Sequence, residues 1–155
     1  MSEWDCGMFS RDELIAEFPR LAAADSPPIE AAEYGHQDFE VPCSEQCIYA
    51  CRGSRRDFGS ALLFWVKSLQ AQDWNGRQSY FRPYAEAGLC EPIGAAEFAG
   101  LVAEYSRSLR LPLPEFLLRL DGFRSGLQMY AEWNDVGAVA ELADEFVAFY
   151  WSTTA

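Results

Sequence analysis

Basic residues are scarce in this chain of 155 residues. It contains 12 Lys plus Arg against 24 Asp plus Glu, which gives a formal net charge of −12 at pH 7. Nucleic acids and anionic lipids are polyanions that bind proteins through Lys and Arg, so a surface this acidic repels both. The composition therefore argues against nucleic acid or a membrane as a direct partner.

Long hydrophobic runs are also missing. The longest apolar run covers residues 61–66, whereas a membrane-spanning helix needs about 18 apolar residues or more. No basic start is followed by an apolar stretch of signal-peptide length. The five cysteines are an odd number, so we expect reduced thiols and a cytoplasmic location. Eleven of the 12 bases are Arg, a bias that hints at a bacterial source.

Residues suited to catalysis are few. His36 is the only histidine, and the chain has neither a G-x-S-x-G nucleophile elbow nor a glycine-rich phosphate loop. The H-x-x-E spacing, which metal-dependent hydrolases use, is absent as well. We therefore expect no enzyme, no catalytic residue and no cofactor. One alternative stays open, in which His36 activates a nearby thiol such as Cys43 or Cys47.

Three of the cysteines are regularly spaced. Cys43, Cys47 and Cys51 recur at intervals of four residues, and thiolates together with His36 are ligands that zinc or an iron–sulfur cluster accepts. On one helix, however, the first and last would lie about 12 Å apart along the axis. Only neighbouring pairs could then share an ion. The spacing favours core packing and no metal site, with a metal or redox pair as the alternative.

Hydrophobic residues recur mainly at helical spacing. Ser10 and Glu13 form an S-x-x-E capping box before the first such pattern. Helices are predicted over 10–18, 29–34, 44–51, 57–72, 82–87, 94–109, from Pro114 through Tyr130, and after Asn134 through Tyr150. The chain has no long run of alternating β-branched residues, the pattern that would indicate a sheet. We predict an all-α fold: a compact single-domain bundle of about five to seven helices over residues 1–155, with one irregular acidic segment.

The acidic residues are unevenly distributed. Residues 1–50 carry a charge of −9, residues 51–124 carry +2 and residues 125–155 carry −5. The segment over residues 25–45 has no base and interleaves acids with aromatic residues, while Glu141 and Glu145 are expected on one face of the last helix. The residues predicted to bind a partner are therefore Glu30, Glu33, Tyr34, Asp38, Phe39, Glu40, Glu45, Glu141 and Glu145.

Three functions fit these features. Aromatic residues make 15% of the chain, and aromatic residues beside acidic charges suit protein–protein interfaces. The preferred hypothesis is a bacterial immunity protein or antitoxin that occludes the basic active-site cleft of a cognate toxin. The second is a secretion chaperone or adaptor for an effector protein, although a dimeric mixed α/β architecture is more usual for that class. The third is a small enzyme or metal-binding protein that uses His36 and the cysteine row.

Overall fold

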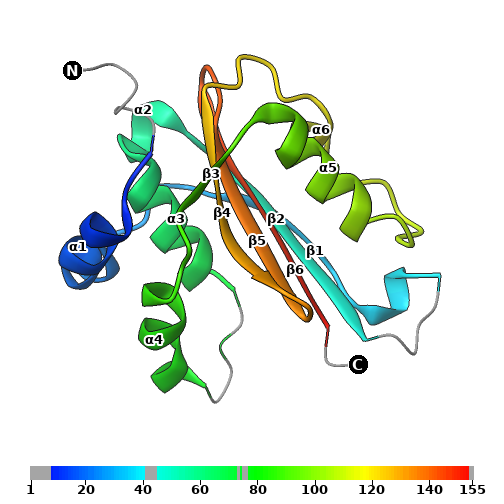
Figure 1. The fold of residues 1–155 in the computed structure, drawn as a ribbon, viewed down its shortest axis with the longest axis horizontal. Coiled ribbons are helices and arrows are strands. Elements are labelled where there is room, and N and C mark those ends of the chain that lie inside the picture. Colours follow the sequence, from blue (N-terminus) through cyan, green and yellow to red (C-terminus); the bar gives the residue numbers. More distant parts are fainter. Residues whose placement is uncertain (1–7, 41–44, 73, 75–76, 154–155) are drawn as a thin grey trace.

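The fold is a six-stranded antiparallel sheet between two layers of helices (Figure 1). The structure is a computed structural model and describes residues 8–40, 45–72, 74 and 77–153. Its strands are β1 (Glu30–Tyr34), β2 (Gln46–Ser54), β3 (Glu91–Ile93), β4 (Ser125–Glu132), β5 (Asp135–Glu141) and β6 (Glu145–Thr153). They follow the order β1-β2-β6-β5-β4-β3, so β1 and β3 are the edges.

Four α-helices form one layer and two form the other. The first layer contains α1 (Arg11–Ala23), α2 (Arg55–Phe58), α3 (Ala61–Gln70) and α4 (Phe81–Glu86), and the second contains α5 (Ala95–Tyr105) and α6 (Glu115–Leu118). Figure 1 shows the two layers on opposite faces of the sheet. Short 3-10 turns, η2 (His36–Asp38) and η4 (Gln78–Tyr80), complete the elements.

Each face of the sheet has its own hydrophobic core. Under α1 and α3, the core is built around Trp65 and Phe64, which are both fully buried, and includes Tyr150 from β6. Under α5 and α6, Phe98 packs against Phe149 and other side chains of the central strands. Because residues along a strand point alternately to the two faces, β5 and β6 need apolar residues at nearly every position.

The all-α prediction is wrong, because strands with apolar residues at nearly every position were taken for helices. Residues 29–34, 44–51 and most of 125–150 were expected to be helical, but they form β1, β2, β4, β5 and β6. The central strands β5 and β6 are buried on both faces along almost their whole length, so their sequences lack the alternation that identifies a half-buried strand. A continuous apolar run fits a buried helix equally well.

Four of the predicted helices are confirmed in position, whereas the helix predicted from Pro114 forms only the short α6. The capping box at Ser10 is present, with the Ser10 hydroxyl accepting from the Glu13 amide at 3.1 Å. The predictions over 10–18, 57–72, 82–87 and 94–109 correspond to α1, α3, α4 and α5. No helix in the described residues is long and apolar enough to cross a membrane.

The second helical layer gives a test of this architecture. Phe98 on α5 is fully buried, so Phe98→Ala is expected to lower the free energy of unfolding by about 3–5 kcal/mol. Leu118→Ala on α6 is the control because Leu118 is 59% exposed, and its effect should stay within about 0.5 kcal/mol. Urea denaturation followed by circular dichroism measures both. Equal effects of the two substitutions would contradict the packing described for α5.

Candidate functional site

Two of the predicted partner-binding acids take part in an ion-pair row across three strands. Arg52 on β2 lies 2.9 Å from Glu30 on β1 and 3.6 Å from Glu145 on β6. Its guanidinium also lies over the ring of Phe116 on α6, 5.2 Å from the ring centroid. The row therefore ties the β1 edge to the central sheet and to α6, which gives Glu30 and Glu145 a structural role.

Glu141 is buried and not on the surface. One of its carboxylate oxygens lies 2.9 Å from the Arg55 guanidinium, and its other oxygen has no partner among the described groups. Burial raises the pKa of Glu141, and Arg55 partly opposes that shift. The expectation that Glu141 and Glu145 share a helix face is wrong, because they lie on β5 and β6.

The residues of the acidic segment separate into core and surface positions. Tyr34 and Phe39 are buried, and the Tyr34 hydroxyl donates to the Pro112 carbonyl at 2.9 Å. The Asp38 carboxylate accepts from the Gly35 amide at 2.9 Å and so caps η2. The exposed members of the predicted set are Glu30, Glu33, Glu40 and Glu45. Binding of a partner by this set stays a prediction.

The cysteine row lies on a strand rather than a helix. Cys47 and Cys51 are both on β2, and an even spacing places them on the same face of the sheet. Cys51 is fully buried and Cys47 is exposed; burial raises the pKa of both thiols. Cys43 lies outside the described residues.

His36 is exposed on η2. In the described part of the chain, no group of three or more His, Cys, Asp or Glu could hold a metal ion.

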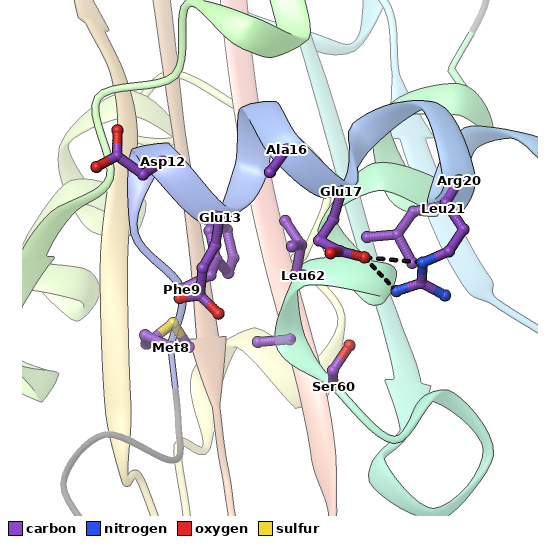
Figure 2. Close-up of a pocket in the computed structure, with 11 residues that line it drawn as sticks. Met8, Phe9, Asp12, Glu13, Ala16, Glu17, Arg20, Leu21, Ser60 and Leu62 are labelled. Atoms are coloured by element: carbon purple, nitrogen blue, oxygen red, sulfur yellow. Dashed lines mark hydrogen bonds and ion pairs between the residues drawn. The ribbon is translucent and has the colours of Figure 1, made fainter.

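A groove between α1 and the start of α3 forms one candidate binding surface (Figure 2). It has a volume of about 620 Å³. Apolar groups from both helices and from the chain before α1 form part of its lining, with acidic residues of α1 beside them. The lining residues used below are Phe9, Ala16, Leu21 and Leu62 among the apolar ones, and Asp12, Glu13 and Glu17 among the acidic ones.

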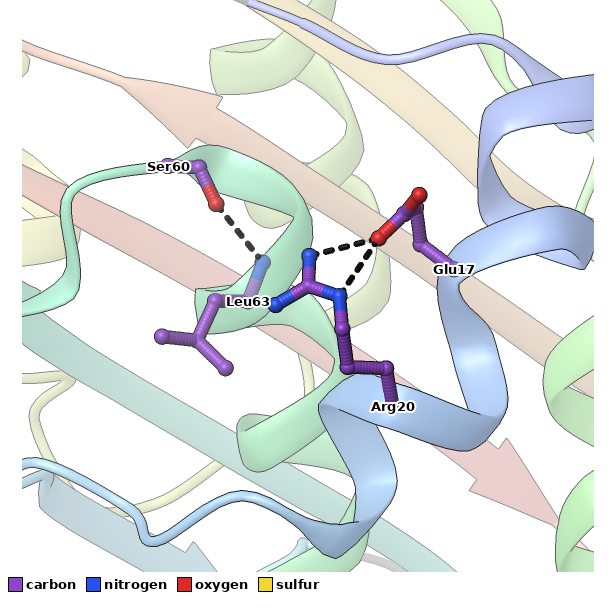
Figure 3. A network of polar contacts seen from close by, with 4 residues as sticks. All are labelled: Glu17, Arg20, Ser60 and Leu63. Carbon is purple, nitrogen blue, oxygen red and sulfur yellow. Dashed lines mark hydrogen bonds and ion pairs between the residues drawn. The ribbon is translucent and has the colours of Figure 1, made fainter.

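Local contacts fix the shape of this groove (Figure 3). Glu17 accepts two hydrogen bonds from the Arg20 guanidinium, one turn further along α1. Across the groove, the Ser60 hydroxyl caps α3 by accepting from the Leu63 amide at 3.2 Å. Asp12 is exposed and forms no hydrogen bond or ion pair within the described residues. Three carboxylates against one guanidinium make the groove acidic.

A second candidate site lies at one end of the sheet, close to the end of α3. This cavity of about 410 Å³ is lined by residues from six parts of the chain, namely β1, β2, the segment after α3, α4, β5 and β6, and we call it the tyrosine pocket. Its aromatic lining is Tyr34, Tyr49, Tyr84, Tyr150 and Trp151, and its polar lining includes Glu33, Gln72, Arg77 and Asp135. Glu33 and Tyr34 were among the predicted partner-binding residues.

The fold holds the tyrosines of this pocket in fixed positions. Tyr84 stacks on Tyr130 with ring centroids 4.2 Å apart, and the Tyr150 hydroxyl hydrogen-bonds the buried Ser68 hydroxyl at 2.9 Å. A Cβ added at Gly137 would lie 3.0 Å from ring carbons of both Tyr130 and Tyr150. Glycine at this position therefore leaves room for the two rings.

Asp135 has no cation partner. The Tyr84 hydroxyl donates to its carboxylate, and no Lys, Arg or His among the described residues forms an ion pair with it. Burial raises the pKa of Asp135, and the hydrogen bond from Tyr84 partly opposes that shift. A half-buried carboxylate that forms no ion pair carries a negative charge that no partner neutralises.

Sequence reasoning missed most of both sites. Acids in the first turn of a helix, such as Asp12 and Glu13, are sufficiently explained by favourable interactions with the helix dipole and so do not indicate a site. Tyr84, Tyr150 and Asp135 lie too far apart in the sequence to form a motif. The only signal was the high aromatic content, which does not show which residues meet.

No family model matches the chain, and comparisons with curated proteins and with solved structures find no similar protein.

The role of Arg55 can be tested by removing it. Arg55→Ala leaves Glu141 as an unpaired buried carboxylate, so the free energy of unfolding should fall by about 3 kcal/mol. Glu141→Gln in the same background should restore part of this loss because the buried charge is gone. Arg56→Ala is the control, since Arg56 is exposed. A loss no larger for Arg55→Ala than for the control would show that the ion pair does not stabilise the fold.

The raised pKa of Asp135 predicts how stability depends on pH. A carboxyl whose pKa is higher in the folded state disfavours folding once it is ionised, so this penalty is absent below about pH 4 and grows as the pH rises. Asp135→Asn removes it and keeps an oxygen that accepts from Tyr84. The stability of the variant relative to the natural chain should therefore increase from pH 4 to pH 7 in urea denaturation. A constant or decreasing difference would contradict the assignment.

Proposed function

We propose that this chain is an inhibitory protein-binding domain, of the immunity protein or antitoxin class, that neutralises a toxin with a basic active-site cleft. The observation that supports this most directly is the acidic groove beside α1. Its apolar lining supplies surface that a partner can bury, and its carboxylates supply attraction for a basic partner. The partner would be a protein toxin or effector with a basic surface.

The use of the basic residues supports the same proposal. Five arginines are engaged in ion pairs with acids of the same chain, namely Arg20, Arg52, Arg55, Arg82 and Arg119. These pairs hold the fold together locally, while exposed acids such as Asp12, Glu33 and Glu104 form no ion pair within the described residues. The surplus negative charge therefore lies on the surface, where it steers a basic partner during association.

A secretion chaperone or adaptor is the second candidate, and the fold class favours it more than the sequence did. Mixed α/β architecture was the expectation for that class, and the chain has this architecture. The support is analogy at the level of fold, which many unrelated functions share. A chaperone of this kind would be a dimer that binds an extended client, whereas the inhibitor needs only one copy. Light scattering of the purified chain separates the two candidates.

The proposal is tested with the product of the directly adjacent reading frame as the first partner. We expect a complex whose association rate falls by about tenfold or more between about 0.05 M and 0.5 M salt, because screening shortens the reach of surface charges. Stopped-flow fluorescence measures this rate. Salt-independent association, or no complex at all, would contradict the proposal.

A matched pair of variants tests the groove itself. Ala16→Arg places a bulky cation inside the groove, and Ala103→Arg makes the same change on α5 in the other helical layer; both alanines are exposed. Only Ala16→Arg should weaken the complex, by about tenfold or more. Because the two variants have the same net charge, equal affinities would exclude the groove as the interface.

A further inference from the structure

The tyrosine pocket combines aromatic walls with unpaired carboxylates. Tyr49, Tyr84 and Tyr150 line it together with Asp135 and Glu33. Aromatic faces attract cations through their negative π-electron density, and the attraction is stronger where water is excluded. Carboxylates beside such faces add a charge of the opposite sign to the cation. This combination is suited to binding a single positively charged group.

No cation in the described part of the chain forms an ion pair with the carboxylates of this site. Asp135 and Glu33 form no ion pair within the described residues, and these residues include all 12 Lys and Arg of the sequence. The hydrogen bond from Tyr84 holds the Asp135 carboxylate in place on one side. A ligand that brought a cation would therefore not have to displace an internal partner of either carboxylate.

We propose that the tyrosine pocket receives one arginine side chain of the basic partner. This inference rests on the proposed function for the source of that arginine. A guanidinium is planar, so it can stack on a tyrosine ring while its N–H groups reach a carboxylate, and it is less strongly hydrated than an ammonium group. Gln72 adds a donor for a neighbouring carbonyl of the partner, because its buried side-chain nitrogen has no acceptor among the described groups.

Arg77 gives the proposal a second, opposite prediction. It is the one cation among the described residues that line the pocket, and it is exposed and forms no ion pair with Asp135 or Glu33. A guanidinium that enters the pocket would be repelled by this charge. Removing Arg77 should therefore strengthen binding, whereas removing the charge of Asp135 should weaken it.

The test uses N-acetyl-arginine amide as the probe and N-acetyl-citrulline amide as its uncharged counterpart. Titration of the isotope-labelled chain followed by NMR should give saturable shifts at Tyr84 and Asp135 with the arginine compound only. Asp135→Asn should weaken binding by about tenfold, Arg77→Ala should strengthen it by about threefold, and Asp144→Asn, an exposed acid outside the pocket, should leave it unchanged. Equal binding of the two compounds, or none of the arginine compound, would overturn the proposal.

The same variants are then measured in the complex with the basic partner. A weaker complex with Asp135→Asn supports insertion of an arginine from the partner, and an unchanged complex overturns it even if the small probe binds. Because the probe titration needs no partner, it also separates the two proposals. If the probe binds but no basic protein forms a complex with the chain, the proposed function is refuted and a guanidinium site in the pocket remains.

Discussion

The burial of β5 and β6 on both faces is the constraint on which the rest of the structure depends. Their side chains alternate between two separate cores, one under α1 and α3 and the other under α5 and α6. Neither helical layer could bury its apolar face without these strands, and an antiparallel sheet this apolar needs cover on both sides. The arrangement leaves the ends and margins of the sheet for polar side chains, and the tyrosine pocket lies at one of these ends.

The same constraint explains what could and could not be predicted from the sequence. Helices α1, α3, α4 and α5 each have one apolar face and signals at their ends, and these were predicted in position. The strands were not, because a strand buried on both sides has no period of two. The interval of four between Cys47 and Cys51 is typical of a helix face, yet it also fits one face of a strand. Local patterns could not resolve this ambiguity.

The candidate sites depended on tertiary structure even more strongly. The sequence indicated an acidic, aromatic protein surface and located it over residues 25–45, but the fold buries Tyr34 and Phe39 and engages Glu30 with Arg52. Tyr84 from α4 and Asp135 from β5 are 51 residues apart in the sequence and meet only in the folded chain. Charge composition thus indicated the kind of partner that we propose, whereas the position of the surface required knowledge of which acids the fold already uses in ion pairs.

The central claim is that a basic partner binds the acidic groove beside α1 and the tyrosine pocket at the end of the sheet. Hydrogen–deuterium exchange of the chain with and without its partner tests this directly, because bound surfaces exchange more slowly. The account predicts added protection in α1 and around Tyr84 and Asp135, with none in α5 or α6. Protection confined to α5 and α6 would contradict it.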